Sequence, residues 1–193
     1  MKSEYKFKER YNPKSNRLQN YDYSSNWWYF ITICTKNREN HFWEIVNWKM
    51  ILNEIGGIVK KFYKEIPEHF PFVELDEFVI MPNHLHMILI ISKDDNYCND
   101  KTIYYPVETK NFLSLQKWIL NGTSKTIWSI IRWFKIWITK WIRNNTDIYD
   151  IWQTNYYDRI IRNEEELYKI RKYIEENPQK WELDKDNSEN LYM

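Results

Sequence analysis

The sequence predicts an α+β fold built on a four-stranded antiparallel sheet. Stretches rich in β-branched and aromatic residues alternate with stretches whose apolar residues recur every three or four positions, a pattern typical of strands and amphipathic helices in turn. Two of the strand stretches are separated by only a short turn, so they should form an antiparallel hairpin. The chain has 193 residues, 43% of them hydrophobic, which suits one domain with its own core.

Seven elements are predicted in the order strand, helix, strand, strand, helix, strand, helix. They comprise a strand at 27–35, a helix at 47–64, strands at 73–80 and 85–91, a helix at 124–145, a strand at 151–161 and a last helix ending at 176. The first six spell βαββαβ, the ferredoxin-like plan, with two helices on one face of the sheet. This plan does not by itself indicate a function.

The two later helices carry the clearest signals. The helix at 124–145 has one wide apolar face, and its other face is basic. The basic residues are Lys125, Arg132, Lys135, Lys140 and Arg143. The last helix should begin at Asn163, because Glu166 three residues later completes a capping-box pattern. It should end at Glu176, because the residue before Pro178 is pushed away from helical geometry.

Charge is unevenly distributed, although the formal net charge is only +1. Residues 1–17 carry six Lys/Arg against two acids, and residues 101–145 carry eight against one, whereas residues 164–193 carry nine acids against five bases. This asymmetry hints at a face that binds a polyanion. We divide the chain into a basic N-terminal arm (1–25), one domain (26–182) and a polar C-terminal tail (183–193).

Several classes of protein are disfavoured. The two cysteines, Cys34 and Cys98, form no CxxC pair, so a zinc site built from paired cysteines is excluded. We expect both to be free thiols in a reducing cytosol, and the protein to be cytoplasmic. The polar N-terminus is unlike a signal peptide, and no apolar run reaches 18 residues, so no membrane span is expected.

The pair His84 and His86 is the most informative chemical feature. Residues two apart on a strand point to the same face, so both imidazoles would project together and could share one cation. The alternative is a chance pair on an exposed strand. Two histidines need further ligands, and Asn177 could offer an amide oxygen beside Tyr173, because residues four apart share a helical face. With 15 tyrosines in the chain, a structural role for Tyr173 is the competing interpretation.

Four stretches resemble a known family. They are Tyr21–Ser24 with Tyr29–Thr35, Phe78–His86, Trp152–Gln153 with Tyr157–Arg162, and Tyr173–Ile174 with Asn177–Pro178 and Trp181. On these stretches the chain resembles the REP-associated tyrosine transposases, a branch of the single-tyrosine transposases of the HUH superfamily. The strings MPNHLH and YIEENP occur in the right order, and the resemblance extends from about residue 20 to 185.

The resemblance implies a ferredoxin-like core and a role for each matching residue. His84 and His86 would bind a divalent metal, Mg²⁺ or Mn²⁺, Asn177 would complete the metal site, and Tyr173 would be the nucleophile. The implied activity is DNA transposition and recombination, by cleavage and rejoining of single-stranded DNA at hairpin-forming repeats through a 5′-phosphotyrosine. The implied assembly is a monomer or a homodimer. Lys135 matches the family's lysine, but the bulky residues after it depart from the pattern.

Several alternatives remain open at this point. The basic residues of the helix at 124–145 and of the arm bind DNA or merely solvate the surface. Lys169, one turn before Tyr173, is either the base that activates the phenol or a solvated helix lysine. The chain as a whole could also be a non-catalytic or domesticated nucleic-acid-binding module on the same fold, or a metal-dependent hydrolase of another substrate.

Overall fold

Antiparallel pairing joins four strands into the central sheet. The computed structural model describes residues 21–46, 49–93 and 125–184. The strands are β1 (Trp27–Cys34), β4 (Val73–Ile80), β5 (His84–Ile91) and β6 (Tyr157–Ile160), in the order β4-β5-β1-β6. Each neighbouring pair is antiparallel. The predicted α+β class and the four-stranded antiparallel sheet are therefore confirmed.

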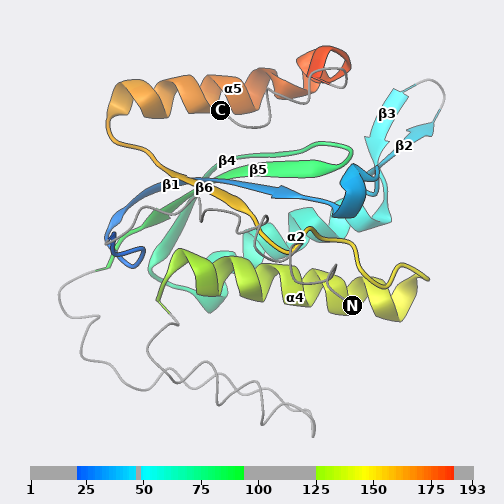
Figure 1. Ribbon diagram of the computed structural model, residues 1–193, viewed down its shortest axis with the longest axis horizontal. Coiled ribbons are helices and arrows are strands. Elements are labelled where there is room, and N and C mark those ends of the chain that lie inside the picture. Colours follow the sequence, from blue (N-terminus) through cyan, green and yellow to red (C-terminus); the bar gives the residue numbers. More distant parts are fainter. Residues whose placement is uncertain (1–20, 47–48, 94–124, 185–193) are drawn as a thin grey trace, which may run out of the picture.

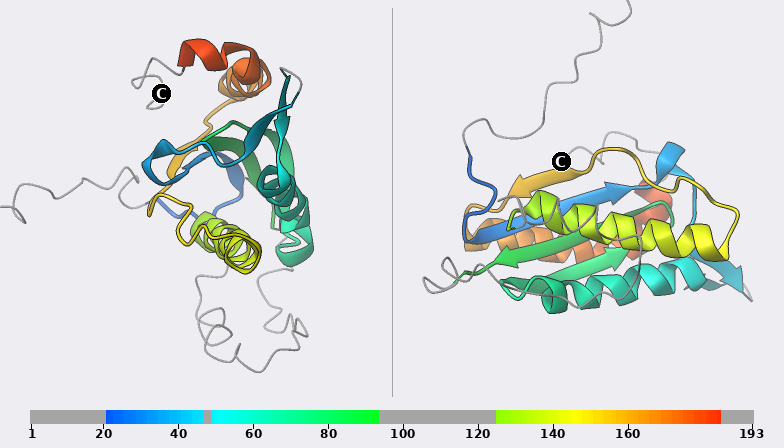
Figure 2. Two further views of the ribbon diagram at one scale, coloured as in Figure 1. Left: turned by 90° about the vertical axis from the view of Figure 1, so that its right-hand side faces the viewer. Right: turned by 90° about the horizontal axis from the view of Figure 1, so that it is seen from below.

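Helices cover both faces of the sheet. The helices α2 (Glu54–His69) and α4 (Ile127–Asn145) lie side by side on one face, and α5 (Glu164–Asp184) lies on the other (Figures 1 and 2). The sheet is thus the middle of three layers. It separates α5 from the basic helix α4, which matters for every later argument about the site.

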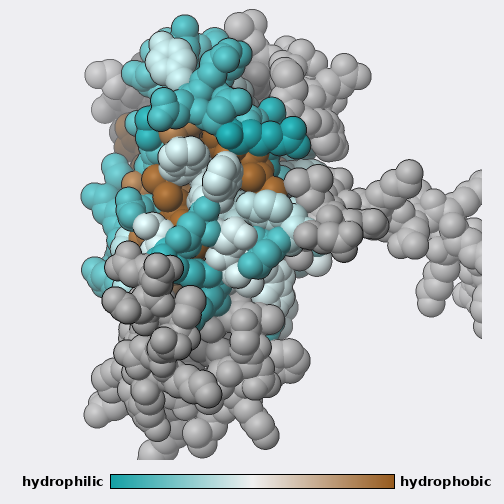
Figure 3. All heavy atoms as spheres, turned by 90° about the vertical axis from the view of Figure 1, so that its left-hand side faces the viewer, coloured by the Kyte–Doolittle hydropathy of each residue, from teal (hydrophilic) through white to brown (hydrophobic). Residues whose placement is uncertain are grey.

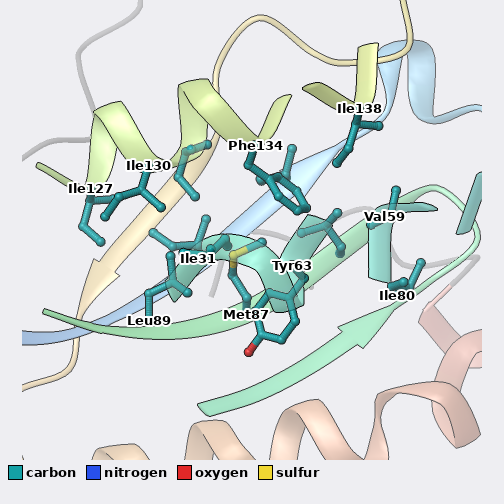
Figure 4. Packing of buried hydrophobic residues seen from close by; sticks show 14 of the residues in the cluster. Ile31, Val59, Tyr63, Ile80, Met87, Leu89, Ile127, Ile130, Phe134 and Ile138 are labelled. Carbon is teal, nitrogen blue, oxygen red and sulfur yellow. The ribbon is translucent and has the colours of Figure 1, made fainter. Parts of the chain in front are cut away.

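Strand alternation divides the apolar residues between two cores. Ile31 of β1 and Met87 of β5 point toward α2 and α4, where they meet Val59 and Phe134 (Figure 4). The residues at the alternate positions of these strands, such as Phe30 and Ile88, point toward α5. This smaller cluster consists of Phe30, Ile88, Ile161, Leu167, Ile170 and Ile174. His84, His86 and Ile88 are two residues apart along β5, so their side chains point to the same face of the sheet, toward α5.

The predicted helix at 47–64 is wrong at its beginning. Residues Trp43–Val46 (β2) and Lys49–Leu52 (β3) form an antiparallel hairpin, and α2 begins only at Glu54. Asn53 caps the helix, because its side chain accepts a hydrogen bond from the Gly56 backbone N–H. Gly56 is required there, since a Cβ would collide with the Phe42 carbonyl oxygen. The helix also extends beyond residue 64, through Pro67 to His69.

One later strand differs from its prediction, whereas the start of the last helix agrees. The predicted strand at 151–161 is reduced to Tyr157–Ile160, preceded by an isolated bridge between Thr35 and Trp152. Between the bridge and the strand, the Lys135 ammonium donates hydrogen bonds to the carbonyl oxygens of Gln153 and Thr154. α5 begins as predicted, with the Asn163 side chain accepting from the Glu166 N–H.

The end of α5 contradicts the prediction. The helix continues past Pro178 to Asp184, and its last turns, red in Figure 2, are turned away from the axis of the earlier part. A proline inside a helix costs about 3 kcal/mol or more. Packing overrides this local preference, because Asn177 is buried and the Trp181 ring lies beside His84, 5.9 Å between centroids.

Several parts of the chain lie outside the described residues: residues 1–20 of the predicted basic arm, residues 47–48, residues 94–124, and residues 185–193 of the predicted polar tail. Within the described ranges, no helix is both long and apolar enough to cross a membrane. Some apolar and aromatic surface is exposed between the α5 and α4 layers at the end of the sheet where β1 begins (Figure 3). Trp27 and Trp128 are 41% and 37% exposed.

Candidate active site

The two histidines of β5 lie next to each other beneath α5. Their ring centroids are 4.7 Å apart. His84 is 3% exposed and His86 is 2% exposed, so the site is nearly closed to bulk solvent. The position of His86 is supported by its antiparallel partner Thr32 on β1, whose hydroxyl oxygen lies 2.8 Å from His86 Nδ1.

Tyr173 reaches this pair from α5. The apolar face of α5 packs on the sheet through Leu167, Ile170 and Ile174, which fixes the rotation of the helix. Tyr173 follows on the neighbouring position, and its hydroxyl oxygen lies 3.3 Å from His86 Nε2. The side chain is only partly buried, so a phenol in contact with the histidines also remains open to a substrate.

Asn177 lies one turn beyond Tyr173 and is 1% exposed. Neither its amide oxygen nor its amide nitrogen has a hydrogen-bond partner among the described residues. An unsatisfied buried polar group costs about 1–3 kcal/mol, so native proteins keep few of them without a reason. The amide, one turn from Tyr173 on the same helix, is thus available to a ligand.

The electrostatics of the site favour neutral imidazoles. Burial lowers the pKa of His84 to about 4, and the nearby positive charge of Arg38 adds to the effect. Burial also lowers the pKa of His86 well below its usual 6.5, helped by His84. Metal ions bind the deprotonated nitrogen of histidine, so both rings are ready to act as ligands at neutral pH.

The donor set fits a divalent ion with mixed nitrogen and oxygen ligands. The described part of the chain has no cluster of three or more His, Cys, Asp or Glu side chains that could hold a metal. A site here would therefore consist of the two imidazoles, the Asn177 amide oxygen, and oxygens from water or substrate. Such a set leaves several coordination positions open, as catalytic metal sites do.

Comparison with known proteins places the chain in a family. It is 47% identical over 172 residues to an uncharacterised protein of Haemophilus influenzae, and the alignment covers 89% of this chain and 91% of that protein. The chain belongs to the family of that protein. No protein-family model matches it.

The fold is that of a REP-associated tyrosine transposase. The structure of such an enzyme bound to a REP hairpin superposes with a TM-score of 0.53 at 18% sequence identity, covering 85% of this chain and 73% of that one. At this identity the likeness establishes a shared fold and leaves the activity to be argued from the site. The α+β architecture with a four-stranded antiparallel sheet is therefore consistent with the transposase fold that the motif resemblance implies.

The five basic residues predicted to bind DNA are not near this site. They belong to α4 or immediately precede it, on the opposite face of the sheet from α5 (Figure 1). Arg132 and Lys140 are exposed and lie over Trp128 and Trp137, at 5.0 and 4.8 Å from the ring centroids. Such cations beside indoles are the usual composition of a surface that binds single strands.

The remaining three cations of this set differ in what they contact. Lys135 donates to Gln153 O at 2.6 Å, and burial lowers its pKa to about 8. It therefore holds the chain that leads to β6. Arg143 donates a hydrogen bond to the Tyr149 carbonyl oxygen, and its guanidinium lies over the Tyr149 ring. Lys125 lies just before the helix. Arg132 and Lys140 are thus the better candidates for contact with a polyanion.

Three residues that contact the histidines were given no role from the sequence, although all three lie in stretches that carry the family resemblance. They are Thr32, Asn83 and Trp181. Asn83 is adjacent to His84, so its place in the motif was a usable signal. The contact of Thr32 depends on the register between β1 and β5, which the sequence does not reveal. Lys169, the candidate base, is exposed and paired with Glu165 at 2.6 Å.

We expect the metal-free protein to lose stability as the pH falls from about 6.5 toward 4. Unfolded histidine takes up a proton near pH 6.5, whereas buried His84 does so only near pH 4. The unfolded state therefore binds more protons in this window, and stability falls by up to about 1.4 kcal/mol per pH unit for each such histidine. Urea unfolding at several pH values measures the slope. His84→Gln should reduce it, and an unchanged slope in this variant would contradict the assignment.

Proposed function

We propose that the protein is a metal-dependent endonuclease and transposase that cleaves and rejoins single-stranded DNA through a 5′-phosphotyrosine on Tyr173. The observation that carries the proposal is the contact between the Tyr173 hydroxyl and His86 Nε2, with His84 next to His86. One turn along α5, the buried Asn177 amide has no hydrogen-bond partner among the described residues. A binding module would have no need of this combination. A hydrolase that releases its product would not need the tyrosine.

The scaffold supports the same proposal. The order of elements and the strand order β4-β5-β1-β6 agree with a ferredoxin-like plan, to which α5 adds the tyrosine on the opposite face. The protein that shares this fold is described as bound to a REP hairpin. We extend this to the present chain and propose a hairpin-forming repeat as its DNA target.

The residues of the site have separate roles in the proposed reaction. A phenol with a pKa near 10 is a poor nucleophile at neutral pH, so it needs help at the phosphate. A bound Mg²⁺ or Mn²⁺, held by His84, His86 and Asn177, would supply Lewis-acid stabilisation of the charge that develops on the phosphate oxygens. The Tyr173 oxygen loses its proton as it forms the new bond to phosphorus, and the bond to the 3′ oxygen breaks, so that this oxygen takes up a proton and leaves as a 3′-hydroxyl. A 3′-hydroxyl can later reverse this exchange and rejoin the strand.

The test is an incubation of the purified protein with a library of single-stranded hairpins and Mg²⁺ or Mn²⁺, followed by a denaturing gel. DNA labelled at its 3′ end should become attached to the protein, whereas DNA labelled at its 5′ end should be released with a free 3′-hydroxyl. Chelation of the metal should prevent both. Retained binding without any covalent product would favour the non-catalytic module.

We expect Arg132 and Lys140 to supply part of the affinity for single-stranded DNA. Replacing both with alanine should weaken binding, and the slope of log affinity against log salt should decrease by about 0.7 for each phosphate that is no longer neutralised. The measurement is fluorescence anisotropy at several salt concentrations. The matched control is Lys60→Ala with Lys64→Ala, which removes the same charge from exposed positions of α2. Equal behaviour of the two double variants would exclude this surface.

A further inference from the structure

The side chain of Asn83 lies between His84 and the short 3₁₀ turn η1 (Lys36–Arg38). Its Nδ2 lies 3.1 Å from the Arg38 carbonyl oxygen, and its Oδ1 lies 2.8 Å from His84 Nδ1. A carbonyl oxygen can only accept a hydrogen bond. The contact to Arg38 therefore fixes which end of the amide is the nitrogen, and the oxygen end must face the imidazole.

This orientation determines where the hydrogen of His84 lies. The Asn83 oxygen can only accept, so Nδ1 of His84 must carry the hydrogen that it donates. A neutral imidazole, which is the form that binds a metal, has only one N–H. Its second nitrogen, Nε2, is then left with a free lone pair, which is what a metal ligand requires.

The backbone around Asn83 is held on several sides. Asn37 and Arg38 have φ angles of 53° and 56°, a left-handed geometry that costs roughly 1–2 kcal/mol per residue when glycine is absent. The Asn83 carbonyl oxygen accepts from the Thr35 N–H at 2.9 Å. Strain of this kind persists only where the surroundings enforce it, and its effect here is to aim the Arg38 carbonyl at the Asn83 amide.

His86 provides a contrast within the same site. Its Nδ1 lies 2.8 Å from the Thr32 hydroxyl, which can donate or accept. Its Nε2 lies near the Tyr173 hydroxyl, which has the same freedom. Neither contact fixes the position of the hydrogen on His86, whereas the amide of Asn83 does so for His84.

We propose that Asn83 is a positioning residue, which holds His84 in the Nδ1–H tautomer and presents its Nε2 lone pair to the divalent ion. The part that concerns the ion rests on the function proposed above. The tautomer rests only on contacts within the chain. Groups of this kind, which orient a ligand from behind, typically change metal affinity about 10- to 100-fold when they are removed.

The test is nitrogen NMR of the metal-free protein with ¹⁵N-labelled histidine, in which long-range couplings show which ring nitrogen carries hydrogen. The four histidine signals are assigned with His84→Gln and single replacements of the others. We expect Nδ1–H for His84 in the unaltered protein. Asn83→Asp keeps an acceptor oxygen and should preserve this tautomer, whereas Asn83→Ala should lose it and bind Mn²⁺ about 10- to 100-fold more weakly.

The unaltered protein alone can overturn the proposal, because hydrogen on His84 Nε2 would contradict it even if no variant folds. An unchanged tautomer in folded Asn83→Ala would also refute it. The measurement uses neither metal nor DNA, so it is separate from the proposed activity. A tautomer that depends on Asn83 in a protein that binds no Mn²⁺ would support the positioning role and refute the metal site.

Discussion

Tyr173→Phe is expected to abolish covalent attachment of the protein to DNA. The substitution removes only the hydroxyl oxygen, which is the atom that would bond to phosphorus, so the rate of adduct formation should fall by roughly 10³-fold or more. The fold should be unaffected, because the phenyl ring is kept and a typical hydrogen bond, such as the 3.3 Å contact of the hydroxyl with His86, contributes only about 1 kcal/mol. The measurement is a denaturing gel with a hairpin substrate.

Tyr168→Phe is the matched control. It makes the same chemical change on the same helix, but Tyr168 is 67% exposed and faces away from the cluster on the sheet. This variant should form the adduct at the normal rate. Continued adduct formation by Tyr173→Phe would show that the phenol of Tyr173 is not the nucleophile, and loss of the adduct in both variants would show that the effect is not specific to Tyr173.

Asn177→Leu should have opposite effects on activity and on stability. Leucine is close to asparagine in size and removes a buried amide that has no partner among the described residues. The metal-free protein should therefore become more stable, by about 1–3 kcal/mol. Metal affinity and DNA cleavage should fall by at least about tenfold, because a ligand oxygen is lost. Urea unfolding and Mn²⁺ titration measure the two effects.

Asn177→Asp separates the ligand role from packing. It keeps an oxygen at the same position, so Mn²⁺ binding should persist, while the buried carboxylate should destabilise the protein when metal is absent. If Asn177→Leu bound Mn²⁺ as tightly as the unaltered chain, the amide would not be a ligand. If that variant were also no more stable, the amide would have a partner such as a buried water.

The parts of the fold that follow from side-chain periodicity could be predicted. Alternation along β5 placed His84 and His86 on one face, and the spacing of four between Tyr173 and Asn177 placed them together on α5. These patterns are local, because strand and helix geometry fix the direction of neighbouring side chains. The relative position of β5 and α5 was not local, and only the motif resemblance connected them before the structure did.

The errors arose where a local pattern had two interpretations. The apolar spacing that indicated a helix from residue 47 continued through what is in fact strand β3, and Asn53, a good N-cap residue, marked the true start. Lys135 was counted with the solvent-facing cations, yet its ammonium binds backbone carbonyls. Tertiary contacts of this kind cannot be recovered from periodicity.

Pro178 interrupts the backbone hydrogen bonding of α5. Since proline has no N–H, the carbonyl of Ile174 loses its helical partner there, and the turns beyond are joined to the tyrosine-bearing part by fewer bonds. Those turns carry Trp181, whose ring rests against His84. The part of the helix that carries Tyr173 is held on the sheet separately, by Ile170 and Ile174. α5 therefore meets the sheet on both sides of the proline, through apolar side chains before it and through an indole after it.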